Sequence, residues 1–351
     1  MSLLWMDYET EFENLAEASF RKEVDENPDY YASLSPRTSK IIYRDTRYNI
    51  DFLYTAYLLG DDKIMEDYAV WLYELMVSVI KGQTPEQTTH YVVEHFDIIR
   101  RCVLDTVSKD KQPELLRLID IAKEKVAKAV PPNRDVTDKS SRYEAEIEQY
   151  MDSLFKKNNR KVFYLVQSFV EKGIPLNDVY VEILAESMRR IGELWHTAQI
   201  TVDTEHYCTS VTQMAMAQLY PVLFEKERKN KTLLCACPGT ELHEMGARMV
   251  ADLFENDGWD SVYLGAAVPE DAMMEAVEEN HPDLVALSVT MPQHLIACQE
   301  MVERLRKEYP GTKIAVGGKA FQSTHEIWKR WQVDFYAVDA RELLNYADQN
   351  C

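Results

Sequence analysis

His243 lies in a segment where it could contact a bound ligand. The segment from Pro238 to Gly246 (PGTELHEMG) follows a short apolar run at residues 232–237 and places His243 two residues after Glu241. An imidazole that ligates a metal usually donates its second ring N–H to a carboxylate or carbonyl, which makes the ligating nitrogen more basic. The glycine three residues later lets a bulky group approach the backbone. The segment is therefore a candidate metal site, although a lone histidine in such a loop is more often an ordinary polar residue.

The candidate loop belongs to a regular alternation of strands and helices in the last third of the chain. Short apolar runs alternate there with helix-period stretches, and continuous apolar strands of this kind predict a parallel sheet covered on both faces. The five runs are TLLCAC (232–237), SVYLG (261–265), LVALSV (284–289), KIAV (313–316) and FYAV (335–338). We expect a flavodoxin-like doubly wound fold, in which ligands bind at the carboxyl ends of the strands where strand order reverses. That position falls at the loops after the first and third strands.

Two more loops on the same rim carry unusual residues. Ser288 and Thr290 place two hydroxyl groups at the end of the third predicted strand. Gly317 and Gly318 follow the fourth strand, where absent side chains leave room for a flat or extended group. Three such loops on one edge are not explained by packing alone.

These loops together resemble the cobalamin-binding domain family, whose pattern is Asp-x-His-x-x-Gly, then Ser-x-Leu or Ser-x-Thr, then Gly-Gly. The matching residues are Glu241, His243, Gly246, Ser288, Thr290, Gly317 and Gly318. The resemblance implies that His243 replaces the dimethylbenzimidazole of the cofactor as the lower cobalt ligand. It also implies that the displaced nucleotide tail enters a slot lined by the serine and the glycine pair. Glu241 departs from the commoner Asp, but its longer side chain can still accept the histidine N–H.

The segment before this domain predicts a helical cap. Residues 143–224 keep a helical period in four stretches with short connections, as in a four-helix bundle. Trp195-His196 and Glu205-His206 stand around one of these connections. A tryptophan offers a flat surface that can shield a ligand, a glutamate can accept a hydrogen bond from a ribose, and imidazoles can ligate cobalt. The alternative is that Trp195 is a helix-end core residue and Glu205-His206 a solvated helix start.

The spacing Trp, nine residues, Glu-His resembles CarH-type light sensors, and the resemblance covers roughly residues 143–340. It implies bound adenosylcobalamin, with methylcobalamin or hydroxocobalamin as other possible forms. By residue match, Trp195 and Glu205 would contact the adenosyl group, and His196 would become the upper cobalt ligand after photolysis. His206 would be a neighbour of that upper face.

The resemblance does not extend to the N-terminus, where those sensors begin with a small basic helix-turn-helix domain. This chain instead has helical periodicity, with a predicted C-cap at Gly60 and a capping box at Thr84-Pro85-Glu86-Gln87. We therefore expect a multidomain α + α/β protein with four parts: an N-terminal helical bundle (1–130), a linker (131–142), a four-helix cobalamin cap (143–228) and a flavodoxin-like cobalamin-binding domain (229–351). The aromatic stripe of the bundle is interpreted as core or a dimer face; it comprises Tyr54, Tyr57, Tyr68, Trp71 and Tyr73.

Composition excludes several classes of function. The 351 residues include 39 Lys and Arg against 59 Asp and Glu, a net charge of −20 that disfavours nucleic-acid or membrane-surface binding. The chain shows no secretory signal pattern and no apolar run near the ~18 residues of a membrane span. Six cysteines match neither a disulfide framework nor a CxxC zinc site. These observations favour a cytoplasmic protein.

His90 and His95 are five residues apart, which disfavours a shared zinc site, and His325 is read as a solvated loop residue.

The sequence thus favours a non-enzymatic cobalamin-binding light sensor, in which photolysis of the cobalt–carbon bond changes upper axial ligation and rearranges the cap. We expect a homo-oligomer that signals to a protein partner, without contacting nucleic acid or membrane. The alternative is a corrinoid methyl carrier of a methyltransferase system. Such carriers typically continue with Asp-Ile-Gly-Lys after the histidine, whereas this chain has Glu244-Met245-Gly246-Ala247.

Overall fold

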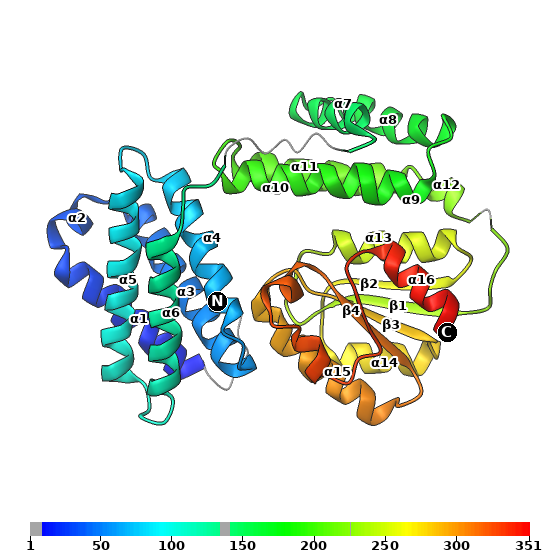
Figure 1. The fold of residues 1–351 in the computed structure, drawn as a ribbon. Helices are drawn as coiled ribbons and strands as arrows, with labels where there is room; N and C mark the ends of the chain where they lie inside the picture. Colours follow the sequence, from blue (N-terminus) through cyan, green and yellow to red (C-terminus); the bar gives the residue numbers. More distant parts are fainter. Residues whose placement is uncertain (1–8, 134–140, 225) are drawn as a thin grey trace. The chain divides into compact units, whose positions relative to one another are not determined.

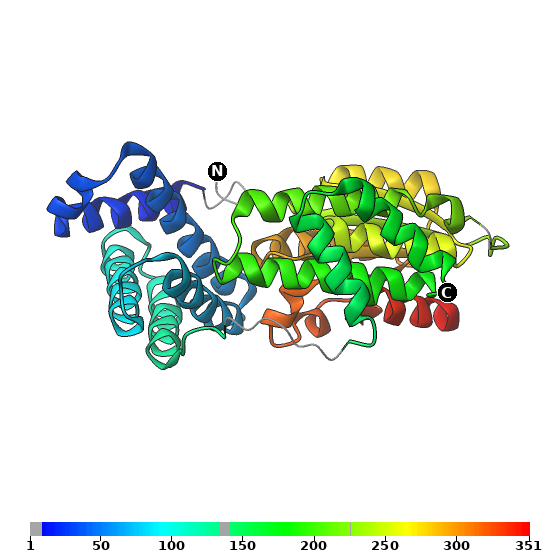
Figure 2. The same ribbon diagram turned by 90° about the horizontal axis from the view of Figure 1, so that it is seen from above.

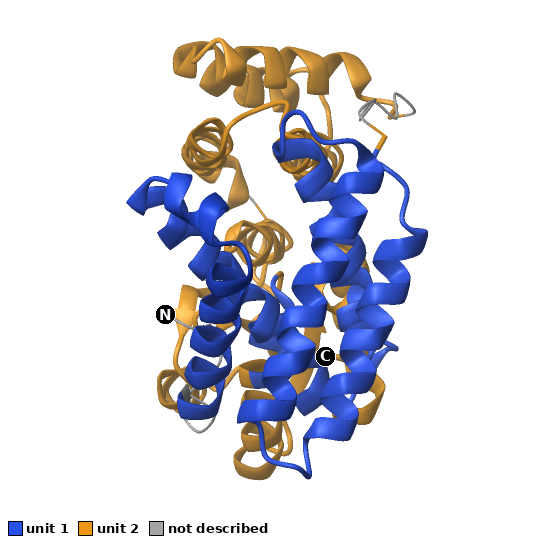
Figure 3. Cartoon of the chain, turned by 90° about the vertical axis from the view of Figure 1, so that its left-hand side faces the viewer, with its two compact units in different colours: residues 1–132, 291–296, 322–327 blue, residues 133–290, 297–321, 328–351 orange. Residues whose placement is uncertain are grey.

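The computed structural model describes residues 9–133, 141–224 and 226–351. They form two compact units (Figure 3). Unit 1 contains residues 1–132 with the short segments 291–296 and 322–327, and unit 2 contains the remainder of the chain. The C-terminal third of the chain therefore enters unit 1 twice. Part of the predicted linker, residues 134–140, lies outside the described residues.

Unit 1 is built on a helical bundle (Figure 1). Its helices are α1 (Glu9–Glu26), α2 (Pro28–Ser33), α3 (Pro36–Leu59), α4 (Lys63–Val79), α5 (Pro85–Thr106) and α6 (Gln112–Lys128). The predicted helix end at Gly60 is confirmed, since this residue caps α3 in the left-handed region with φ 59°. The predicted capping box is also confirmed, because the Thr84 and Gln87 side chains each bond the other's backbone N–H at the start of α5. The sequence analysis did not identify α1, α2 or the first half of α3.

The core of the bundle is aromatic and contains a buried polar network. Tyr54, Tyr68 and Tyr73 are buried, so this part of the predicted stripe is core. His95 is buried as well, with Nδ1 3.1 Å from Glu23 Oε2 and Nε2 2.8 Å from the Asn49 amide. These contacts account for both ring nitrogens of His95, whereas His90 on the same helix is 82% exposed.

Unit 2 contains the predicted parallel sheet. Its strands are β1 (Thr232–Pro238), β2 (Asp260–Val268), β3 (Leu284–Ser288), β4 (Lys313–Gly317) and β5 (Phe335–Ala337). They pair in parallel in the order β2-β1-β3-β4-β5. The order therefore reverses between β1 and β3, as the flavodoxin-like prediction requires. This reversal sets the loops after β1 and β3 side by side.

Helices cover both faces of the sheet. They are α13 (Met245–Asn256), α14 (Glu270–Asn280), α15 (Leu295–Glu308) and α16 (Ala340–Asn350), with the short 3-10 turns η3 (Pro292–His294), η4 (Lys319–Ser323) and η5 (Ile327–Arg330). Figure 1 shows α13 and α16 on one face and α14 and α15 on the other. Because the central strands β1, β3 and β4 are covered on both sides, their side chains are buried and apolar without alternation, whereas those of the edge strand β2 are mostly half-buried.

The cap precedes the sheet and packs on the layer that contains α13. Its helices are α7 (Glu144–Phe155), α8 (Asn159–Glu171), α9 (Leu176–Asp178), the π-helical segment η2 (Val179–Ala185), α10 (Glu186–His196), α11 (Val202–Ala217) and α12 (Tyr220–Leu223). Because α9, η2 and α10 follow one another directly, the cap has the predicted four long helices. Seen from above, these helices lie over α13 (Figure 2).

Polar contacts fix the cap to this layer. Tyr180 of η2 donates a hydrogen bond of 2.9 Å to Asp252 of α13. Arg341 of α16 pairs with Asp178 and Glu182 of the cap at 2.8 and 2.9 Å. The apolar residues of the cap, of α13 and α16 and of one face of the sheet form one continuous core. Cap and sheet domain are therefore packed as one body in this structure.

Candidate functional site

The loop between β1 and α13 holds His243 through a buried carboxylate. Glu241 is completely buried, and its Oε1 accepts hydrogen bonds from His243 Nδ1 at 2.6 Å and from the His243 backbone N–H at 2.9 Å. Its Oε2 accepts from the Thr290 backbone N–H at 2.9 Å. The expectation that the longer Glu side chain can reach the imidazole is therefore confirmed.

This geometry leaves the second imidazole nitrogen available. An ionised carboxylate only accepts hydrogen bonds, so Nδ1 carries the proton and Nε2 keeps its lone pair when the ring is neutral. The His243 side chain is 57% exposed, so a ligand can reach it. An accessible imidazole that is oriented by a buried carboxylate is the arrangement found at metal sites.

The electrostatics of the loop favour positive charge at His243. The pKa of His243 is raised above its ordinary value, first by the hydrogen bond to Glu241 and further by the negative charges of Glu241 and Glu205, while burial opposes the shift. Glu205 lies in the first turn of α11. The cap thus contributes to the potential at the predicted cobalt ligand.

Two of the three glycines of the site, Gly317 and Gly318, are required by close backbone approaches. A Cβ added at Gly246 would lie 3.8 Å from Ser288 Oγ, so Gly246 faces the predicted slot residue Ser288 at an ordinary van der Waals distance. A Cβ at Gly318, which has φ +100°, would lie 2.3 Å from the carbonyl oxygen of Val289, and one at Gly317 would lie 2.8 Å from that of Ala337. The glycine pair therefore lets neighbouring chain segments pack closely. The sequence analysis instead expected the missing side chains of this pair to leave open space for a ligand.

The predicted upper-face residues lie around the turn between α10 and α11. Trp195 and His196 are the last two residues of α10 and are half-buried. Glu205 Oε1 accepts a hydrogen bond from Thr209 at 2.9 Å, and His206 is 74% exposed with Nε2 3.7 Å from Glu205 Oε2. The fully buried Ile191 is the core residue of this part of α10. These four residues lie on either side of the connection between α10 and α11, two at the end of α10 and two in the first turns of α11.

The sequence analysis missed a hydrogen-bonded group around Glu244. Glu244 Oε1 accepts from Gln213 Nε2 of α11 at 3.0 Å, and Oε2 accepts from the Tyr263 hydroxyl of β2 at 3.0 Å. Nothing in the sequence pairs these three positions, which become neighbours only when cap, loop and sheet are assembled.

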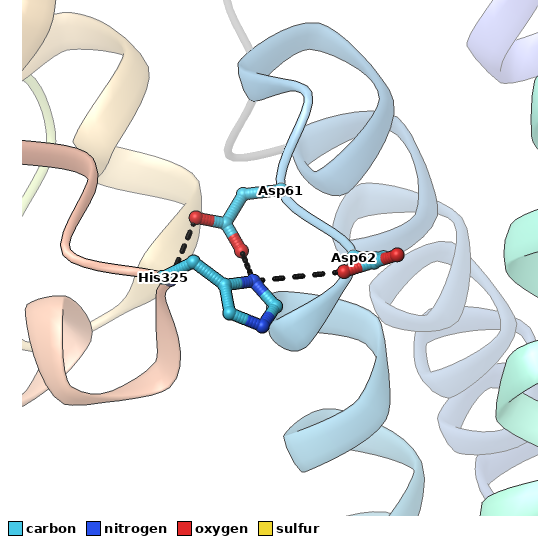
Figure 4. A group of neighbouring side chains, drawn as sticks. All are labelled: Asp61, Asp62 and His325. Atoms are coloured by element: carbon cyan, nitrogen blue, oxygen red, sulfur yellow. Dashed lines mark hydrogen bonds and ion pairs between the residues drawn. The ribbon is translucent and has the colours of Figure 1, made fainter. Parts of the chain in front are cut away.

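His325 is more than the solvated loop residue expected from sequence. Its side chain is 63% exposed, but its backbone N–H and Nδ1 contact the buried carboxylate of Asp61 at 2.8 and 3.0 Å within unit 1 (Figure 4). Asp62 lies 3.6 Å from the same ring nitrogen. These three residues are close enough together to hold a metal ion, but the hydrogen bonds of Asp61 explain the arrangement without one.

Two regions of the chain resemble known B12 binding proteins. Residues 231–344 match a family model described as a B12 binding domain, and residues 146–220 match a second model with the same description. The HTH-type transcriptional repressor CarH of Myxococcus xanthus is 30% identical over 166 residues, which are 47% of this chain and 54% of CarH. Monomethylamine corrinoid protein 2 of Methanosarcina acetivorans is 23% identical over 167 residues, 46% of this chain and 76% of that protein. The structure of the Methanosarcina barkeri monomethylamine corrinoid protein superimposes with a TM-score of 0.53 at 19% identity and covers 60% of this chain and 100% of that one.

The chain is therefore a cobalamin-binding protein, with a helical cap and a flavodoxin-like B12 binding domain arranged as in corrinoid proteins. Among known proteins it resembles CarH, of whose length it spans about half. Within the part of the chain that the structure describes, no helix combines the length and the apolar character needed to cross a bilayer.

Proposed function

We propose that this protein is a cobalamin-dependent light sensor in which His243 is the lower cobalt ligand. The observation that carries the proposal is the buried carboxylate of Glu241, which orients the imidazole and leaves Nε2 accessible. Adenosylcobalamin, when bound, supplies a cobalt–carbon bond that visible light breaks. We assign residues of this chain to the lower face and to the upper face of that cofactor.

The lower face is assigned to the loops after β1, β3 and β4. His243 supplies the ligating nitrogen, and Glu241 holds its tautomer and raises its basicity. Because Glu241 also accepts from the Thr290 N–H, the carboxylate connects the ligand loop to the β3 loop. We assign Ser288, Gly246 and the backbone of the Gly317-Gly318 pair to the slot for the nucleotide tail.

The upper face is assigned to the cap. Trp195 would shield the adenosyl group with its ring, and Glu205 would accept a hydrogen bond from the ribose. We assign His196 to the upper cobalt position after illumination, with His206 beside it. The half-buried position of Trp195 and His196 at the end of α10 supports this assignment.

We assign the transmission of the light signal to unit 1 and a protein partner. The chain leaves the β3 and β4 loops, enters unit 1 at residues 291–296 and 322–327, and is held there by the contacts between His325 and Asp61. A rearrangement of the ligand loops would therefore reach the bundle through the chain itself. The net charge of −20 favours a protein partner with basic character over nucleic acid.

A corrinoid methyl carrier is the second candidate. The likeness to monomethylamine corrinoid proteins in sequence and in fold favours it. The loop sequence Glu244-Met245-Gly246-Ala247 and the Trp-His and Glu-His pairs of the cap favour the sensor.

One experiment separates the two functions. The protein is loaded with adenosylcobalamin in the dark, its visible spectrum is recorded before and after green light, and the series is repeated with His196→Ala. The exposed His90 of α5, which is assigned to no site, gives a control, His90→Ala. The sensor predicts a light-dependent spectral change whose final state is altered in His196→Ala and not in His90→Ala. A photolysed state that is the same in His196→Ala as in the unchanged protein, together with methyl transfer from a methylated donor to the protein-bound cobalamin after its reduction to Co(I), would identify the carrier.

A further inference from the structure

Glu244 joins three parts of unit 2 at the residue directly after the predicted cobalt ligand. Its carboxylate accepts from Gln213 of α11 through Oε1 and from Tyr263 of β2 through Oε2, each at 3.0 Å. We propose that Glu244 is a positioning residue that fastens the cap helix α11 to the loop of His243. This inference rests on the proposed function, because it gives a route by which cap and lower ligand loop influence each other.

A register shift between β1 and β2 determines the position of Tyr263. The register between β1 and β2 pairs Cys235 with Tyr263 and Ala236 with Gly265, so the strand has one extra residue at this point. Extra residues of this kind re-aim side chains and are common beside functional sites. The Tyr263 hydroxyl lies 3.2 Å from the Glu244 carbonyl oxygen in addition to its contact with the carboxylate. The side chain and the backbone of Glu244 are therefore both tied to β2.

Gly265 permits the close approach of β2 to this carboxylate. It has φ +84°, and a Cβ added there would lie 3.4 Å from Glu244 Oε2. A side chain at this position would be strained in the left-handed region, and its Cβ would be in van der Waals contact with the carboxylate. The local structure of β2 thus fits a carboxylate held at this place.

Gln213 connects this carboxylate to the upper-face residues. It lies eight residues after Glu205 on α11, which is about two helical turns and about 12 Å along the axis. The rigid helix α11 therefore has Glu205 near one end and the bond to the His243 loop in its second half. Any displacement of α11 away from the sheet must either break the Gln213–Glu244 bond or carry the loop with it.

The loop thus has two carboxylates with separate tasks. Glu241 is bonded to the imidazole and to the β3 loop, and Glu244 is bonded to the cap and to β2. Loss of the Glu244 contacts should loosen α11 and leave the orientation of His243 unchanged. This separation makes the proposal testable without light and without cofactor.

The test compares substitutions on α11 in the full chain. Gln213→Ala removes the donor, and Gln213→Lys supplies an ammonium group that can bond Glu244 again. Gln218→Ala is the matched control, since Gln218 lies at the end of the same helix and bonds only locally, to the carbonyl of Met214 at 3.4 Å. Backbone hydrogen exchange of α11 is measured in the cofactor-free protein. The visible spectrum of the cobalamin-loaded protein in the dark then reports on His243.

We expect α11 amides to exchange about fivefold or more faster in Gln213→Ala, which corresponds to the loss of one hydrogen bond to a charged group. Gln213→Lys should restore slow exchange, Gln218→Ala should leave it unchanged, and the dark spectrum should be the same in all variants. Unchanged exchange in Gln213→Ala, or no recovery in Gln213→Lys, would overturn the proposal. A protein that passes this test but does not respond to light would contradict the proposed function and leave the role of Glu244 in place.

Discussion

The carboxylate of Glu241 is completely buried, and its Oε1 lies 2.6 Å from Nδ1 of His243. A buried carboxylate needs partners, and this one has the His243 ring, the His243 N–H and the Thr290 N–H. The pair therefore fixes the tautomer of the imidazole and joins the loops after β1 and β3. These loops meet where the strand order reverses, which is the ligand position of a doubly wound fold.

Removal of this carboxylate should weaken cobalamin binding. We expect Glu241→Ala to lower the affinity about 10- to 100-fold, the usual effect of removing the partner that orients a metal-bound histidine. Titration of the cofactor-free protein with cobalamin, followed by the visible spectrum, measures this change. Leu242→Ala is the control, because Leu242 is 73% exposed in the same loop. An affinity for Glu241→Ala equal to that of the control would contradict the assigned role.

Cobalamin binding through His243 should depend on pH. The proton and cobalt compete for Nε2, and the hydrogen bond to Glu241 raises the pKa of His243. Below that pKa the affinity should fall by about tenfold for each pH unit, since one proton must be released. Glu241→Gln removes the charge that raises the pKa, so the fall should begin at lower pH, and Glu205→Gln should give a smaller shift in the same direction. Affinity measured across the acidic range tests this prediction, and identical profiles for the three proteins would refute it.

The glycine after β4 should be needed for both stability and binding. Gly318→Ala places a Cβ 2.3 Å from the Val289 carbonyl oxygen at φ +100°, so the β3 and β4 loops must separate. We expect a loss of about 1–3 kcal/mol in the free energy of unfolding, together with weaker cobalamin binding. Gly311→Ala is a matched control, because a Cβ there meets no atom within 4 Å. Denaturant unfolding and cobalamin titration measure the two effects, and equal behaviour of both variants would show that the close approach is unimportant.

Asp61 should stabilise the segment at residues 322–327. Asp61→Ala leaves the backbone N–H and the Nδ1 of His325 without this acceptor, which we expect to cost about 1–3 kcal/mol. Asp120→Ala removes only a surface ion pair with Arg100 at 3.3 Å and should cost less than about 1 kcal/mol. Proteolytic cleavage within residues 322–327 should become faster in Asp61→Ala alone. If both variants resist cleavage equally, His325 does not hold this segment.

Local sequence patterns were sufficient to predict much of the fold. The apolar runs identified all five strands, and the position of β1 between β2 and β3 agrees with the expected reversal of strand order. The helix end at Gly60 and the helix start at Thr84 were predicted correctly because helix caps are local hydrogen-bond patterns. Strand β2 extends to Val268, beyond the predicted end at residue 265, because its pairing with β1 continues past the glycine.

Contacts between distant segments could not be predicted from the sequence alone. Glu241 and His243 are two residues apart, so their pairing follows from the local motif. Gln213 and Glu244, or Asp61 and His325, become neighbours only through tertiary packing. A histidine in a polar loop such as His325 carries no local sign of a buried carboxylate partner 264 residues away.

Electron paramagnetic resonance of the reduced Co(II) form tests the lower ligand most directly. The protein is labelled with ¹⁵N and loaded with unlabelled cobalamin, and the nitrogen splitting of the cobalt lines is compared with that of unlabelled protein. If His243 is the lower ligand, each triplet from ¹⁴N becomes a doublet from ¹⁵N, and His243→Ala abolishes the change. A triplet that persists in the labelled protein would mean that the benzimidazole remains on cobalt, and His243 would not be its ligand.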